Sequence, residues 1–97
     1  MADSMPYRIA FTREAEEAFL GLDKAVRVRI AKKALQLERD GFASRHLKFG
    51  LPFFVEEIGG YRLVFETLES ERKKVVIFVG SHGDYQKWYS TLHHPSR

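Results

Sequence analysis

The 97-residue chain contains no cysteine, which excludes disulfide bonds and metal sites built from thiolates. It also has no long apolar segment, since the longest run, "VVIFV", is far too short to span a bilayer. The first residues, "MADSMPY", have neither the basic start nor the apolar core of a signal peptide. We therefore expect a cytoplasmic protein that does not contact a membrane.

Sequence motifs for metal and nucleotide binding are absent as well. The chain has four histidines but no HExxH pattern, and it has no GxGxxG, Walker-type or GxSxG segment. His93 and His94 lie at the end of the chain, away from any second ligand in the sequence. We expect no metal ion and no organic cofactor.

The excess of positive charge is small overall but concentrated in one region. The net charge is +3 and the pI is about 9.3, values that by themselves indicate nucleic-acid binding only weakly. Between Lys24 and Lys48, however, eight lysines or arginines stand against two acidic residues. Such a run is typical either of a solvated helix face or of a surface that binds an anionic partner, and both interpretations stay open.

What the sequence does contain is enough apolar material for one domain. Hydrophobic residues make up 44% and aromatic residues 13% of the chain, a composition that supports a packed core at this length. We expect a single domain over 1–97, with flexible tails at 1–5 and 91–97.

The first half of the chain predicts a strand followed by a helical hairpin. "YRIAF" (7–11) alternates as a strand does, and Thr12 is placed to cap a helix. Apolar residues then recur at helical spacing, "GLD" breaks the pattern, and Asp23 is placed to cap a second helix that should end at Gly41.

The second half predicts three strands and a last helix. "PFFVEEI" and "YRLVFETL" flank Gly59 and Gly60, a strong signal for a β-hairpin, and "KKVVIFVG" predicts the next strand, buried on both faces. "DYQKWYSTL" predicts a short helix with Asp84 as its N-cap. The order indicates an α+β fold with one largely antiparallel sheet.

Two positions stand out as candidates for chemistry. Arg62 shares a strand face with Val64, so it needs an anionic partner, either Glu56 or Glu57 on the paired strand or a bound phosphate. His82 follows a buried strand, where it acts either as a packing residue or as an acid–base group.

The aromatic residues of the last helix are spaced for one surface. Tyr85 and Tyr89 are four residues apart and share a helix face, and Trp88 is placed to fix the helix to the sheet.

Taken together, "YRIAFTREAEEAFLGLD", "RHLKFG", "GGYRLVFETL" and "VVIFVGSHGDYQKWY" resemble segments of the RelE/ParE superfamily of toxin–antitoxin toxins. The resemblance covers about residues 6–90. It implies a RelE-like fold: an N-terminal strand, a helical hairpin, a three-stranded antiparallel meander and a C-terminal helix. RelE-like members are metal-free endoribonucleases that cut mRNA on the ribosome by attack of a 2′-OH on the neighbouring phosphate. ParE-like members inhibit DNA gyrase instead.

Carried over to this sequence, the resemblance implies a catalytic set. Arg62 would bind the scissile phosphate, His82 would protonate the leaving oxygen, and Glu57 (or Glu56) would act as general base. Tyr85 or Tyr89 would stack on a base. The implied RNA contacts are Arg45, His46, Lys48 and Lys87.

One departure keeps the alternatives open. Relatives often carry basic residues on the strand before the hairpin, where this chain reads "FFVEEIGG". A ribosome-dependent nuclease, a ParE-like gyrase inhibitor and a non-catalytic relative therefore remain in competition. All three imply an acidic antitoxin as partner, which we expect to bind the basic helix at Arg27, Arg29 and Lys33 and the apolar groove beside it. The nuclease also implies the ribosome and mRNA as partners, and we expect a monomer when the antitoxin is absent.

Overall fold

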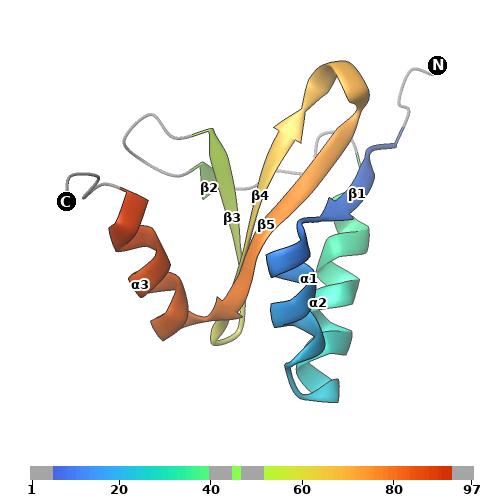
Figure 1. Cartoon of the computed structure of the whole chain (residues 1–97). Coiled ribbons are helices and arrows are strands. Elements are labelled where there is room, and N and C mark those ends of the chain that lie inside the picture. Colours follow the sequence, from blue (N-terminus) through green and yellow to red (C-terminus); the bar gives the residue numbers. More distant parts are fainter. Residues whose placement is uncertain (1–5, 40–44, 47–51, 93–97) are drawn as a thin grey trace.

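The computed structural model describes residues 6–39, 45–46 and 52–92, with the backbone alone at 45–46. It confirms the α+β class (Figure 1). The elements are β1 (Arg8–Phe11), α1 (Arg13–Leu20), α2 (Lys24–Gln36), β2 (Arg45–His46), β3 (Phe53–Ile58), β4 (Tyr61–Leu68), the 3-10 turn Glu69–Glu71, β5 (Lys73–Ser81) and α3 (His82–Leu92).

The strands form one five-stranded sheet in the order β1-β5-β4-β3-β2. β1 runs parallel to β5, and the other neighbouring strands are antiparallel. The predicted hairpin is confirmed, because β3 and β4 pair from Ile58 and Tyr61 outward around the two glycines. The two-residue strand β2, which the sequence pattern did not indicate as a strand, lies at the far edge beside β3.

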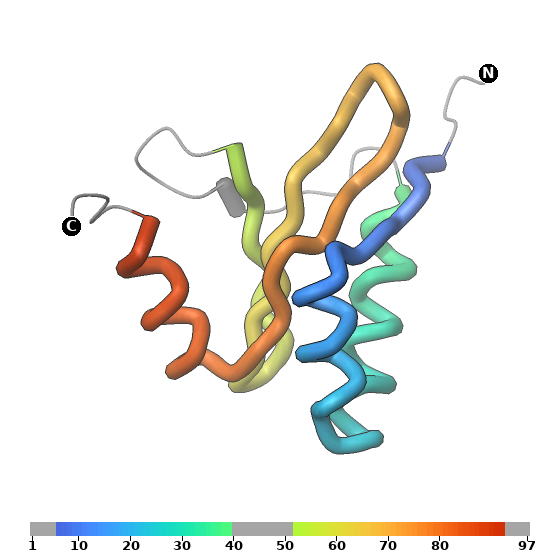
Figure 2. The backbone as a smooth tube through the Cα atoms, viewed as in Figure 1, coloured from blue at the N-terminus to red at the C-terminus, as the bar shows by residue number. Residues whose placement is uncertain are grey.

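Helices cover both faces of the sheet. α1 and α2 lie side by side on one face and α3 lies on the other (Figures 1 and 2). The core under α1 and α2 consists of Ala15, Val26, Ile30, Leu37, Ile58, Leu63, Phe65, Val76 and Val79. The core under α3 has three buried residues, Val55, Val64 and Tyr85. The sheet is thus buried on both faces, but much more deeply on the hairpin side.

A β-bulge interrupts the pairing of β4 with β5. Val64 lies opposite Phe78 and Phe65 opposite Val76, so Ile77 is an extra residue in β5. Val76 and Val79 both face α1 and α2, while Ile77 and Phe78 both face α3. The run of apolar residues in this strand is nearly continuous because both faces of β5 are buried and because the bulge at Ile77 interrupts the alternation of its side chains.

The starts of the two hairpin helices differ in how they are capped. The hydroxyl oxygen of Thr12 accepts a hydrogen bond from the backbone N–H of Ala15 at 3.1 Å, which confirms the predicted cap. Asp23 occupies the N-cap position of α2, but its side chain makes no capping bond.

α2 ends earlier than the sequence predicted. The helix stops at Gln36 because the backbone N–H groups of Glu38 and Arg39 bond three residues back, to Leu35 and Gln36, which tightens the last turn. Gly41, the predicted end, lies outside the described residues.

The start of α3 corrects another prediction. β5 continues through Ser81, so α3 begins at His82, and the Ser81 hydroxyl accepts from the backbone N–H of Asp84 at 3.1 Å. Ser81 is therefore the cap, and Asp84 as N-cap is wrong: it lies within the first turn. α3 also continues to Leu92, two residues into the segment expected to be a tail.

Candidate functional site

The turn formed by Gly59 and Gly60, the diglycine turn, lies where three strands and one helix meet. The backbone N–H of His82 donates to the carbonyl of Gly60 at 2.8 Å, which joins the start of α3 to this turn. Arg62 lies opposite Glu57 in β3 and opposite Gly80 in β5. The turn and the start of α3 share one end of the molecule (Figure 2). The sheet thus brings Arg62, Glu57 and His82 to one location.

Arg62 is held firmly by the turn. Its Nη1 donates to the carbonyls of Gly59 at 3.1 Å and Tyr61 at 2.9 Å, and its Nε lies 4.0 Å from Oε2 of Glu57. The side chain is only 13% exposed. Within the part of the chain that the structure describes, the second terminal nitrogen, Nη2, has no hydrogen-bond partner. The internal partner expected for Arg62 is therefore Glu57, and Nη2 is the one guanidinium nitrogen for which the described residues provide no partner.

Glu56 and Glu57 lie on opposite faces of β3. Glu56 is nearly buried and pairs with Lys33 of α2, with 3.7 Å between Nζ and Oε1. Glu57 is half exposed and lies on the face of Arg62. Of the two candidate bases, only Glu57 belongs to this site.

His82 is exposed at the first position of α3. Its ring lies 6.5 Å from that of Tyr85, at 29° between the planes. The amino end of a helix carries partial positive charge, which favours an anion beside this residue. His82 is thus exposed at the diglycine turn, to which its backbone N–H is bonded, and an exposed imidazole at this place could act as a proton donor.

Tyr85 and Tyr89 differ in access. Tyr85 is buried at 8% exposure, and it packs against Phe78 and stacks on Tyr89 at 5.7 Å and 13°. Tyr89 is half-buried. Stacking of a nucleic-acid base on Tyr85 would require α3 to move, so Tyr89 is the better placed of the two.

Trp88 holds α3 on the sheet. Its ring stacks on Phe78 at 5.1 Å and meets Phe53 at 6.2 Å, as the sequence predicted. Phe53, Phe78 and the aromatic residues of α3 form one continuous packed layer on this face.

The predicted RNA contacts are less well defined. Lys87 is exposed on α3. Arg45 and His46 form β2, where only the backbone is described, and Lys48 lies outside the described residues. Described contacts do not join any of these residues to the diglycine turn, so their role stays a prediction.

The three residues assigned to antitoxin binding have different surroundings. Nη1 of Arg27 donates to the carbonyls of Leu20 and Leu22, which ties α2 to the end of α1. Lys33 pairs with Glu56. Nη1 of Arg29 lies 3.4 Å from the position that a Cβ would take on Gly59. Sequence reasoning did not place Arg29 at the diglycine turn, because helix-to-strand packing has no local sequence signal.

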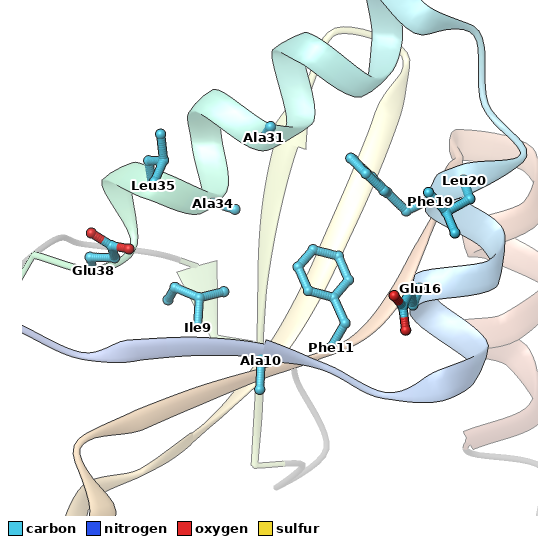
Figure 3. A pocket seen from close by; sticks show the side chains of 10 residues that line it. All are labelled: Ile9, Ala10, Phe11, Glu16, Phe19, Leu20, Ala31, Ala34, Leu35 and Glu38. Carbon is cyan, nitrogen blue, oxygen red and sulfur yellow. The ribbon is translucent and has the colours of Figure 1, made fainter.

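The expected apolar groove lies between α1, α2 and β1 (Figure 3). It has a volume of about 600 Å³ and is lined by Ile9, Ala10, Phe11, Glu16, Phe19, Leu20, Ala31, Ala34, Leu35 and Glu38. Leu20 and Leu35 at its mouth are 60% and 62% exposed. Its charged lining residues, Glu16 and Glu38, are acidic. The basic residues of α2 do not line it.

The described residues show neither a metal site nor a membrane-spanning helix. They contain no cluster of three side chains suited to bind a metal ion. No described helix is long and apolar enough to cross a membrane.

Comparison with known proteins relates this fold to solved structures of RelE toxins. No family model and no curated protein sequence matches the chain. Among solved structures, a mutant of the E. coli toxin RelE in the free state is 25% identical with a TM-score of 0.74, covering 89% of this chain and 93% of that one. The RelBE2 toxin–antitoxin complex of Mycobacterium tuberculosis is 20% identical with a TM-score of 0.69, covering 79% and 92%.

An archaeal structure agrees with these two. The RelE–RelB complex of Pyrococcus horikoshii is 20% identical with a TM-score of 0.64, and the match covers 81% of this chain and 98% of that one. Bacterial and archaeal RelE toxins therefore share the arrangement of sheet and helices described above. The chain has the RelE-like toxin fold.

Proposed function

We propose that the chain is the toxin of a type II toxin–antitoxin system and that it cleaves mRNA on the ribosome in the cytoplasm. The observation that carries this proposal is the meeting of Arg62 and His82 at the diglycine turn, within a RelE-like fold. Arg62 offers the Nη2 edge of its guanidinium to a phosphate, and His82, whose backbone N–H is bonded to Gly60, offers an exposed imidazole at the same turn.

The proposed chemistry needs no metal. The 2′-oxygen of the RNA attacks the neighbouring phosphorus and the bond from phosphorus to the 5′-oxygen breaks, which leaves a 2′,3′-cyclic phosphate. Glu57 accepts the proton of the 2′-OH, and His82 donates a proton to the departing 5′-oxygen. Arg62 stabilises the charge that develops on the phosphate oxygens, and Tyr89 stacks on a base.

The antitoxin is the second partner that we propose. The groove between α1, α2 and β1 offers exposed leucines to an apolar segment, and solved RelE structures include complexes with RelB antitoxins. Because the charged residues that line the groove are acidic, an acidic antitoxin would place apolar side chains there and its carboxylates on the basic face of α2.

Primer extension on a message from cells that express the protein tests the nuclease. Cleavage should fall only within translated codons, vanish when the start codon is removed, and drop strongly in the variant Arg62→Ala. Growth arrest without cleavage, together with a loss of DNA supercoiling, would select a gyrase inhibitor instead.

A non-catalytic antitoxin-binding protein is the second candidate. It is favoured by the pairing of Arg62 with Glu57 and by the lack of any basic residue in β3. In the same experiment, a normal message pattern with normal growth and supercoiling would select it.

A further inference from the structure

Two arginines reach the diglycine turn from opposite faces of the sheet. α2 lies on the face of Glu56, as the ion pair with Lys33 shows, whereas Arg62 lies on the face of Glu57. Nη1 of Arg62 donates to the Gly59 carbonyl, and Nη1 of Arg29 lies 3.4 Å from the position that a Cβ would take on the same glycine. A single residue therefore separates two guanidinium groups.

The backbone conformation of the turn favours glycine at position 59. Its φ is +58°, a conformation that L-residues with side chains seldom adopt. A Cβ at this position would stand 3.4 Å from Nη1 and 3.6 Å from Nη2 of Arg29. These are ordinary van der Waals distances, so the guanidinium of Arg29 lies directly against the turn.

Arg29 differs from its neighbours on α2 in what it contacts. Arg27 donates to two carbonyls and Lys33 pairs with Glu56, so both have a role within the fold. Arg29 is exposed, and within the described ranges no carboxylate lies at ion-pair distance from it. The positive charge of Arg29 is therefore not neutralised by an ion pair within the described residues.

The surroundings of the turn favour an anion. His82 and the amino end of α3 lie beside it through the hydrogen bond to Gly60. Two acidic residues oppose them: Glu57, which is engaged by Arg62, and Asp84 in the first turn of α3. Both arginines carry planar groups that match phosphate oxygens.

We propose that Arg29 and Arg62 form a two-arginine phosphate site across the diglycine turn. Arg62 binds the scissile phosphate, and Arg29 binds an adjoining phosphate of the same RNA strand. This inference rests on the proposed nuclease function and assigns Arg29 to RNA rather than to the antitoxin. RNA is favoured because Arg29 shares its turn with Arg62, whereas the apolar groove proposed for the antitoxin does not include Arg29 among its lining residues.

The test measures RNA affinity as a function of salt. The probe is a short single-stranded RNA with methylated 2′-hydroxyls, so that it is not cut, and binding is followed by fluorescence anisotropy. Arg29→Gln should weaken binding about tenfold at low salt. It should also reduce the slope of log affinity against log salt by about 0.7, the value for one phosphate contact on a single strand.

Arg13→Gln is the matched control, since Arg13 is an exposed arginine on α1 that pairs only with Glu17 among the described residues. It removes the same charge and should change affinity less than about twofold. Arg29→Lys keeps the charge and should restore the salt slope while binding more weakly than wild type. Thermal unfolding of each variant checks that the fold is intact.

The outcomes separate this inference from the proposed function. If Arg29→Gln behaves like Arg13→Gln while Arg62→Ala is impaired in binding and cleavage, the two-arginine site is wrong and the nuclease stands. If Arg29→Gln loses antitoxin affinity but not RNA affinity, Arg29 belongs to the antitoxin surface. Wild-type protein that neither binds nor cuts RNA would overturn both proposals.

Discussion

The two faces of the sheet are built differently. Under α1 and α2, nine buried residues form a core that is aliphatic except for Phe65. Five of its side chains are fully buried, those of Ile30, Leu37, Leu63, Phe65 and Val76. Under α3 there are three buried residues, and half-buried aromatic rings pack around them, as they also do around the hairpin core. The hairpin face therefore supplies most of the apolar burial, while the α3 face carries Arg62 and His82 at its end.

This division separates stability from the proposed chemistry. Deep aliphatic packing stabilises the sheet whatever lies on the opposite face. The α3 face is left with exposed, polar and aromatic groups, the types that contact RNA in other proteins. Variants of the hairpin core and variants at the end of the α3 face should therefore fail in different assays.

The largest expected effect lies at the end of the α3 face. His82→Gln should lower the single-turnover rate of mRNA cleavage by roughly 10²–10⁴-fold, because the loss of a general acid acts on the transition state. RNA affinity and thermal stability should stay near wild type. Gln86→Ala, an exposed change on the same helix, is the control. If His82→Gln cuts at the wild-type rate, His82 is not the general acid and has only a structural role at the start of α3.

The opposite pattern is expected in the hairpin core. Leu63 is fully buried, so Leu63→Ala should lower the free energy of unfolding by about 2–5 kcal/mol. Urea denaturation followed by circular dichroism measures it. Thr67→Ala, a half-buried position on the same strand, should cost much less. Equal losses at both positions would contradict the assignment of the core to this face.

A smaller effect should come from the ion pair that links α2 to β3. Lys33→Met removes the cation next to the nearly buried Glu56, which should lower the free energy of unfolding by about 1–3 kcal/mol. Lys32→Met, an exposed neighbour, is the control. The double variant Lys33→Met, Glu56→Gln should recover part of the loss, and no recovery would mean that Lys33 acts through packing alone.

The smallest effect is expected at the start of α1. Thr12→Ala removes the capping bond to Ala15 and should cost about 1 kcal/mol of unfolding free energy. Thr12→Ser retains the hydroxyl and should lie close to wild type. Cleavage should be unaffected in both variants, because this cap serves the hairpin face.

How much the sequence could predict depended on how local each feature is. The Thr12 cap and the diglycine turn depend on neighbouring residues, and both were predicted correctly. The N-cap of α3 was misplaced from Ser81 to Asp84, because β5 extends further than its apolar run.

Features that depend on packing were out of reach. The sequence could not separate Glu56 from Glu57, since the face of each follows from the register of β3 with β4. It also could not place Arg29 at the diglycine turn, because the approach of α2 to that turn is set by tertiary contacts. The RelE-like fold itself was predicted from segments spread over most of the chain, and the solved structures support it.

The bulge at Ile77 has a consequence for how chains of this shape can change length. Elsewhere in β5, losing one residue would turn every later side chain to the wrong face. Loss of Ile77 would instead bring Val76 and Phe78 into regular alternation, with Val79 still facing the hairpin helices. Deletion of this single codon would therefore keep the later side chains of β5 on their present faces. It would also remove the bulge, so that the strand leading to His82 would be straighter.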